Sequence, residues 1–269
     1  MFKFKIILTE LCNANCSHCY MAFNKSQKTM TEDDICLIIN NMPLDTKKVV
    51  FTGGEVFLAQ DLLLFAIKTL KEKFVDLNIG VETNGIVLYK NWDNAKTTMN
   101  LLKGLGVSYM RFSDDPFHET GGVDLQKVRK LAKVGDEIGL KTRYLKQEKA
   151  VAIGKAVLLS DDFKKKGFCM NTKESTSNTY IFLDVDGNAS ICSWECIPPV
   201  GNMKTDSWEV IQNNLNKEFY QLILSGNILE AINLLEEDEK IREENGVFIK
   251  EHGECMLCNK IFSRQREYL

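Results

Sequence analysis

Residues 12–20 read CNANCSHCY, so that Cys12, Cys16 and Cys19 form a C-x3-C-x2-C pattern on a loop after a predicted strand. Three thiolates can ligate three irons of a [4Fe–4S] cube and leave the fourth iron open. Structural zinc sites and electron-transfer clusters usually take four protein ligands. A zinc loop that borrows a distant ligand or His18 is the alternative, and the ligand count favours the cluster.

Nine cysteines occur in a chain of 269 residues whose net charge is −3. Residues 1–9 do not resemble a secretory signal, and no apolar run is long enough to span a membrane. We therefore predict a cytoplasmic protein, in which clustered thiols indicate metal binding or catalysis. The net charge argues against a nucleic-acid partner. Cys36 stands alone in an apolar helical stretch and is interpreted as a core residue.

The first half of the chain alternates predicted strands and helices, which is typical of α/β proteins. The expected strands are Phe2–Thr9, Lys48–Thr52, Leu77–Thr83, Ser108–Ser113 and Leu140–Leu145. The expected helices are Thr31–Asn41, Leu58–Phe74, Ala95–Leu105 and Leu125–Ile138. The stretch Glu148–Leu159 is expected to complete the series. This pattern predicts a parallel sheet, a partial (β/α)6 TIM-like barrel, with its site at the C-terminal strand ends.

The pattern changes after about residue 160. Tyr180–Cys192 contains two alternating runs joined across Asp186-Gly187, which predicts a β-hairpin. Predicted helices follow at Asp206–Leu215, Glu218–Leu224 and Leu229–Glu244. We expect two domains, residues 1–160 and a small α+β domain over residues 161–269.

The first motif and a second one together resemble the radical S-adenosylmethionine (radical SAM) superfamily. The second motif is Gly53-Gly54-Glu55, which follows the second predicted strand. The resemblance implies that SAM chelates the open iron, that the glycines approach it closely, and that Glu55 pairs with its methionyl ammonium. An aromatic residue commonly flanks the third cysteine in this family, and Tyr20 in that position implies a backbone contact with the adenine.

The resemblance also implies three further SAM contacts. Asn84 and Ser113 end the third and fourth predicted strands, where the family places ribose and carboxylate ligands. Arg143 is the candidate for a salt bridge to the methionyl carboxylate. A strand-end cap or a surface polar role is an equal alternative for each residue.

The C-terminal cysteines resemble the ligands of a twitch domain, a shortened SPASM domain that holds an auxiliary [4Fe–4S] cluster. The expected ligands are Cys169, Cys192, Cys255 and Cys258. Cys196 is an alternative to Cys169, because the interval from Cys169 to Gly187 is longer than usual in the family. A four-cysteine structural zinc site is the competing interpretation.

Asp115 and His118 follow the fourth predicted strand and are the candidate catalytic pair. An acid with a nearby histidine can bind a substrate amine or hydroxyl, or transfer a proton. A polar loop without catalytic function is an equal alternative.

The resemblance implies an enzyme that cleaves SAM to a 5′-deoxyadenosyl radical and abstracts a hydrogen from its substrate. The leading hypothesis is a maturase of a ribosomally made peptide that introduces a cross-link, an oxidation or an epimerisation. The rival is a small-molecule dehydrogenase of the aminoglycoside-biosynthesis type, which the short segment before the first strand favours. The expected partners are a reductant such as flavodoxin or ferredoxin and, for a peptide, a separate leader-recognition protein. A non-catalytic cluster-binding protein is the third interpretation.

Overall fold

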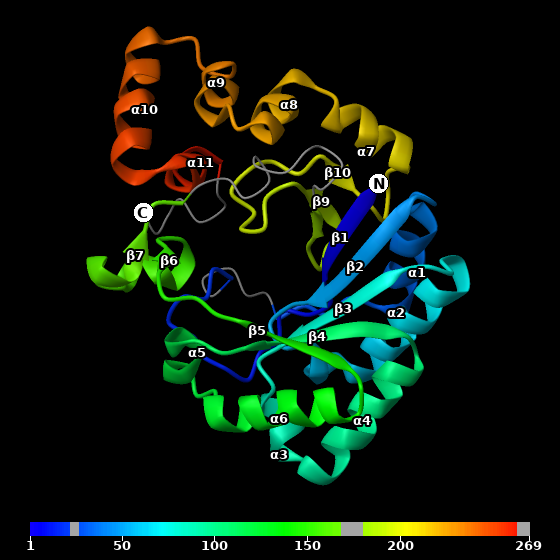
Figure 1. Cartoon of the computed structure of the whole chain (residues 1–269). Coiled ribbons are helices and arrows are strands. Elements are labelled where there is room, and N and C mark those ends of the chain that lie inside the picture. Colours follow the sequence, from blue (N-terminus) through cyan, green and yellow to red (C-terminus); the bar gives the residue numbers. More distant parts are fainter. Residues whose placement is uncertain (22–26, 168–179, 263–269) are drawn as a thin grey trace.

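The computed structural model describes residues 1–21, 27–167 and 180–262 (Figure 1). The strands of the main sheet are β1 (Phe2–Ile7), β2 (Thr46–Thr52), β3 (Asn78–Thr83), β4 (Val107–Ser113), β5 (Lys141–Leu145), β8 (Tyr180–Leu183), β9 (Asn188–Ser190) and β10 (Gly201–Asn202). They lie in the order β10-β9-β8-β1-β2-β3-β4-β5. The strands from β8 to β5 are all parallel, and β9 and β10 extend the sheet antiparallel. The predicted α/β class and partial barrel are confirmed.

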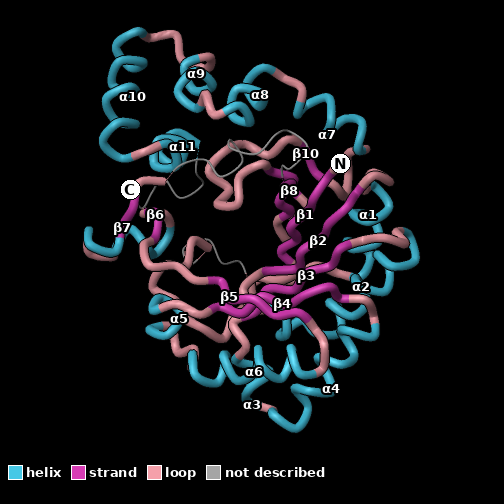
Figure 2. The backbone as a smooth tube through the Cα atoms, in the orientation of Figure 1, coloured by secondary structure: helices cyan, strands magenta, loops and turns pink. Residues whose placement is uncertain are grey.

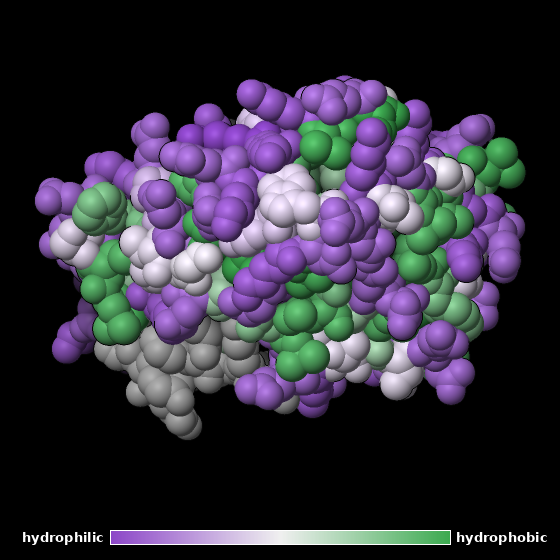
Figure 3. Space-filling model, turned by 90° about the horizontal axis from the view of Figure 1, so that it is seen from below, coloured by the Kyte–Doolittle hydropathy of each residue, from purple (hydrophilic) through white to green (hydrophobic). Residues whose placement is uncertain are grey.

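Helices cover the convex face of this sheet, while its concave face turns toward loops (Figures 1 and 2). The helices that follow strands β1 to β4 are α1 (Glu32–Asn41), α2 (Gln60–Lys73), α3 (Ile86–Lys90), α4 (Trp92–Gly104), α5 (Pro116–Thr120) and α6 (Leu125–Glu137), with the 3-10 turn η1 (Val56–Ala59) before α2. The start of α1 is fixed by a capping box between Thr31 and Asp34. In Figure 3 the outer face seen from below is mostly hydrophilic, with apolar patches between the polar side chains.

Successive side chains of the parallel strands point alternately to the helix-covered core and to the concave face. Phe4, Phe51 and Phe112 are fully buried among the helices. The neighbouring positions in the same strands point to the concave face, and several of them are charged. Parallel strands buried on both faces are usually apolar throughout. The charges therefore indicate a face that meets solvent or a ligand.

The stretch Glu148–Leu159 does not add a strand to the main sheet, so this prediction is wrong. Its short strand β6 (Ala150–Val151) pairs with β7 (Lys164–Lys165) in a separate small sheet, and the 3-10 turns η2 (Gly154–Leu158) and η3 (Asp161–Phe163) complete the segment. Gly154 has φ +57° and no room for a Cβ against the backbone of Tyr20. This turn docks the segment on the cysteine loop instead of the sheet edge.

The predicted hairpin is confirmed as β8 and β9, and β8 pairs in parallel with β1. It is therefore part of the main sheet, although the expected boundary near residue 160 assigned it to the second domain. The boundary itself stays a prediction. The helices after it are α7 (Trp208–Leu215), α8 (Glu218–Ser225), α9 (Ile228–Asn233), α10 (Glu239–His252) and α11 (Glu254–Phe262). The single helix expected over Leu229–Glu244 is thus divided between α9 and α10.

The C-terminal helices arch over the open side of the sheet (Figure 2). Their buried side chains, such as Ile211 and Leu257, join the same apolar core as those of the parallel strands. In the part of the chain described, no helix is both long and apolar enough to cross a bilayer.

Candidate functional site

A cavity of about 450 Å³ opens at the C-terminal ends of the parallel strands. Its wall comprises the cysteine loop, the ends of β2, β3 and β4, residues after β5, and Ser193 and Trp194 after the hairpin. Its volume falls in the range of small-molecule and cofactor sites. Position and size agree with the site predicted for a partial barrel.

The thiols of Cys12, Cys16 and Cys19 all face this cavity. Burial, followed by the neighbouring Cys12 and Cys19 thiols, raises the pKa of Cys16 to about 12. Three thiolates on one loop can hold three irons of a [4Fe–4S] cube and leave the fourth iron open.

Gly53 and Gly54 contact the backbone of the cysteine loop. The Gly54 N–H donates to the Thr9 carbonyl and the Glu55 N–H donates to the Leu11 carbonyl, each over 2.7 Å. A Cβ at Gly54 would overlap the Leu11 carbonyl oxygen. Because the glycines have no Cβ, their backbone packs directly against the loop that carries the cysteines.

Glu55 is buried beneath the loop, outside the described wall of the cavity. Its carboxylate accepts bonds from the Thr83 hydroxyl over 2.7 Å and from the Asn84 and Phe57 N–H groups over 2.8 and 3.1 Å. Burial raises the pKa of Glu55 despite these bonds. The carboxylate thus ties the end of β2 to the end of β3. Its contact with the methionyl ammonium stays a prediction.

Asn84 and Ser113 line the cavity as expected, and Arg143 does not. The Asn84 amide donates to Asn13 Oδ1 over 3.0 Å and lies 3.8 Å from Cys12 Sγ, so it braces the cysteine loop. Arg143 is exposed, with its guanidinium 5.7 Å from the Tyr109 ring centre. The cation on the wall after β5 is Lys146, which the sequence analysis missed.

Tyr20 and His18 both line the cavity. The Tyr20 backbone packs against Gly154, and burial raises the pKa of the phenol well above its usual range. The His18 ring stacks on Phe117 with ring centres 4.9 Å apart. Two aromatic rings that flank the third cysteine are therefore available to an adenine, one on either side of it in sequence.

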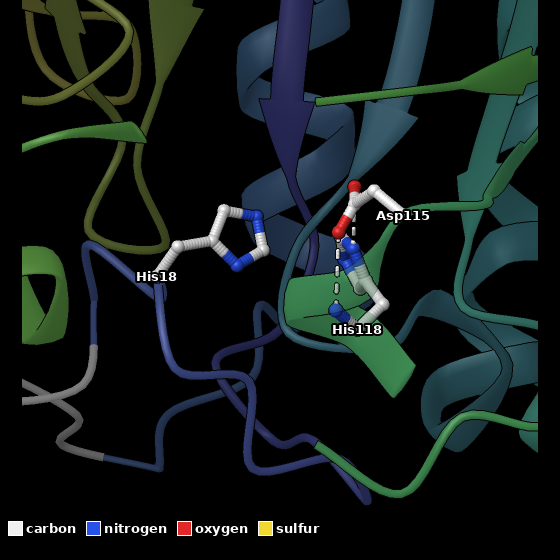
Figure 4. Close-up of side chains that lie close together, drawn as sticks. All are labelled: His18, Asp115 and His118. Carbon is white, nitrogen blue, oxygen red and sulfur yellow. Dashed lines mark hydrogen bonds and ion pairs between the residues drawn. The ribbon is translucent and has the colours of Figure 1, made fainter. Parts of the chain in front are cut away.

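His18, Asp115 and His118 form one cluster (Figure 4). Asp115 caps α5 by accepting from the Phe117 and His118 N–H groups, and its other oxygen lies 2.9 Å from His118 Nδ1. Burial alone would raise the pKa of Asp115, but the His118 contacts outweigh it and lower the pKa. Burial and the nearby His118 lower the pKa of His18 to about 4. Their ligand atoms lie within 4.8 Å of one another, so the cluster can move a proton or hold a cation.

Three charged residues on the concave face were also missed by the sequence analysis. Glu82 on β3 lies between Lys5 of β1 and Arg111 of β4, and all three line the cavity. The signal was present, because charged residues alternate with apolar ones in these strands. The alternation in Phe2–Thr9 predicts a strand but not which of its faces meets the cavity.

The structure brings four C-terminal cysteines together, and one of them is Cys196. Cys192 and Cys196 share a side-chain hydrogen bond, which together with burial and the nearby Cys258 and Cys255 thiols raises the pKa of Cys196. Cys196, Cys255 and Cys258 are buried. Cys169 lies outside the described residues, so the choice between it and Cys196 stays open.

Comparison with known proteins agrees with this geometry. A family model described as Radical SAM superfamily matches residues 6–142. The solved structure of BtrN in complex with AdoMet and 2-DOIA has 17% identity and a TM-score of 0.57, and covers 86% of this chain and 90% of that chain. Native anSMEcpe with bound AdoMet and Cp18Cys peptide has 12% identity and a TM-score of 0.61, with 83% of each chain covered.

At these identities the two structures show the shared fold. No curated protein sequence matches significantly. The family match spans half of the chain and contains both the cysteine loop and Gly53-Gly54-Glu55. The chain belongs to the radical SAM superfamily, whose enzymes bind a [4Fe–4S] cluster and S-adenosylmethionine.

Proposed function

We propose that this enzyme is a maturase that modifies a ribosomally made peptide by hydrogen abstraction. The observation that carries the proposal is the cavity, in which three cysteine thiols face the same space as the Asp115–His118 pair. A bound cluster with SAM supplies the one-electron cleavage that yields a 5′-deoxyadenosyl radical. The protein itself positions the reactants and keeps water away.

Each part of the wall has a defined task in this proposal. Cys12, Cys16 and Cys19 hold the cluster, and Asn84 keeps their loop in place. His18 and Tyr20 contact the adenine, Ser113 and Lys146 the methionyl carboxylate. Because Asp115 fixes the ring of His118, that imidazole can take or give a proton at the substrate.

The C-terminal thiols belong to the proposal as an electron relay. Cys192, Cys255 and Cys258 with Cys169 or Cys196 offer the four ligands that close a [4Fe–4S] cluster. The burial of Cys196, Cys255 and Cys258 suits a group that exchanges electrons rather than binds substrate. Such a cluster would accept the electron that a substrate radical loses, and with a proton passed to His118 the product would lack two hydrogens. A flavodoxin or ferredoxin is the proposed reductant, and a separate protein the proposed reader of the leader peptide.

Dehydrogenation of a small molecule is the second candidate. It is favoured by the cavity volume of about 450 Å³, which has to hold SAM together with the substrate, and Trp194 is part of the cavity wall. The BtrN structure, which contains 2-DOIA beside AdoMet, shows that this fold also accommodates a small molecule. A peptide substrate would have to insert a single side chain into the same space.

Co-expression with the short open reading frames that flank the gene tests the proposal. We expect one encoded peptide to lose the mass of two hydrogens, or to gain one deuteron in heavy water if the reaction is an epimerisation. The matched control is Cys16→Ala, which should leave every peptide unchanged. Unchanged peptides with an enzyme that still forms 5′-deoxyadenosine would contradict the maturase and favour the small-molecule candidate.

A further inference from the structure

The deep end of the cavity carries a charged triad from three strands. Lys5 Nζ lies 2.7 Å from Glu82 Oε2, and the Arg111 guanidinium contacts the other oxygen of the same carboxylate. The Glu82 side chain is 7% exposed, whereas those of Lys5 and Arg111 remain 27% and 24% exposed. The carboxylate is thus enclosed, and the two cations still reach the cavity.

The triad consists of two cations and one carboxylate, so its own formal charge is +1 when all three groups are ionised. Burial alone would raise the pKa of Glu82, but Lys5 and Arg111 outweigh it and lower the pKa, so the acid is ionised. One carboxylate then opposes two cations.

Lys5, Glu82 and Arg111 lie deeper in the cavity than the residues proposed to contact SAM. Arg111 precedes Ser113, the last residue of β4, by two positions, which corresponds to about 7 Å along a strand. The cysteine loop begins beyond the end of β1, and Lys5 lies within that strand. In the proposed function the SAM carboxylate lies at the level of the cysteines, where Ser113 and Lys146 line the cavity. Lys5 and Arg111 remain for the second reactant.

We propose that Lys5 and Arg111 form a subsite that binds one carboxylate of the substrate, such as a peptide carboxyl group or that of a small acid. The proposal rests on the proposed function only in taking this cavity as the substrate site. The net charge of +1 matches a monoanionic carboxylate and would leave a phosphate dianion half balanced. Lys5 and Arg111 lie on either side of Glu82, and each has N–H donors beyond those that contact it for a carboxylate oxygen of the substrate.

Binding of a matched pair of probes tests the subsite. N-acetylglycine and its neutral isostere N-acetylglycinamide are titrated into the anaerobically reconstituted enzyme with SAM, and binding is followed by ligand-observed NMR. We expect the acid to bind at least about tenfold more tightly than the amide, as a charged hydrogen bond implies. Arg111→Met and Lys5→Met should remove this preference. Lys141→Met, an exposed lysine on β5 outside the cavity wall, should retain it.

Separate measurements test the carboxylate subsite independently of the proposed function. Cluster absorbance and substrate-free formation of 5′-deoxyadenosine report the SAM site, and Arg111→Lys replaces Arg111→Met if the latter does not fold. Equal binding of acid and amide, tighter binding of inorganic phosphate, or weakened SAM binding in Arg111→Met would each overturn the subsite. A retained preference for the acid in an enzyme that never cleaves SAM would support the subsite and contradict the function.

Discussion

The two cysteine groups of this protein differ in how they are assembled. The N-terminal group lies within eight residues on one loop, which is held by backbone bonds to Gly54 and Glu55 and faces the cavity. The C-terminal group combines a hairpin loop with α11, some sixty residues later in the chain, and is buried in the core. Catalytic metal sites keep an open position, and structural or electron-transfer sites are closed. The same ligand type can therefore serve two roles because the surrounding fold differs.

Removal of one cysteine from the N-terminal group, which faces the cavity, should have the largest effect. We expect Cys16→Ala to abolish 5′-deoxyadenosine formation, a loss larger than the roughly 100-fold typical when a hydrogen-bond partner of a metal ligand is removed. The iron content should fall by about one cluster per chain, as read from absorbance and iron assay. Cys36→Ala, which removes a thiol in α1 away from both groups, is the control. If Cys16→Ala still formed as much 5′-deoxyadenosine as the wild type, the N-terminal group could not be the catalytic one.

Removal of one C-terminal ligand should separate the two roles. Cys258→Ala is expected to keep substrate-free SAM cleavage within about tenfold of wild type while it lowers the melting temperature, because metal binding there is coupled to folding. Iron content measured on Cys169→Ala and Cys196→Ala in parallel identifies the fourth ligand. If Cys258→Ala abolishes SAM cleavage in a folded protein with an intact first cluster, the groups are not independent.

Replacement of Glu82 tests how stability depends on pH near the N-terminal cysteine group, because this buried carboxylate lies deeper in the same cavity. Glu82→Gln should lower the free energy of unfolding by about 3 kcal/mol at pH 7, since it leaves two cations without their partner. The pKa of Glu82 is lowered in the folded protein, so its contribution is complete above the unfolded pKa of about 4.3 and is lost as the pH falls further. Urea titrations should therefore show the difference from wild type shrinking below about pH 4. A difference that persists there would assign the effect to packing.

Substitutions of two glycines test how the cysteine loop is supported, and we expect the smallest effect from them. Gly54→Ala should reduce cluster occupancy and destabilise the protein by about 1–3 kcal/mol, because a Cβ there overlaps the Leu11 carbonyl. Gly104→Ala, in a helix with open space around it, should stabilise by up to about 1 kcal/mol. Thermal unfolding and the cluster absorbance of both variants provide the measurement. Equal cluster content would show that the loop tolerates displacement.

Local patterns predicted most of the fold, because β1 to β5 and their helices each carry their own periodicity. The errors concern long-range pairing. Residues 148–159 contain enough apolar side chains for a strand, but Gly154 and the bond from the Lys155 N–H to the Cys19 carbonyl place them on the cysteine loop. The pairing of β8 with β1 depends on contacts that no local pattern encodes.

The candidate site shows the same limit. The cysteines and Gly53-Gly54 are recognised by spacing, and the cavity includes Asn84, Ser113, Asp115 and His118 where strand ends predict them. Arg143 and Lys146 differ by three positions at the end of β5, and only the structure shows which one lies on the cavity wall. The triad of Lys5, Glu82 and Arg111 combines three strands, so no single motif contains it.

The pairing of β8 with β1 has a consequence for synthesis on the ribosome. Lys3 pairs in register with Tyr180, so one edge of the first strand stays uncovered until about 177 further residues have been made. Such a non-local closure slows folding, and an uncovered strand edge invites pairing with other chains. During that interval the cysteine loop, which directly follows β1, is already outside the ribosome with its thiols accessible. Delivery of iron and sulfide can therefore begin before β8 is synthesised and covers the free edge of β1.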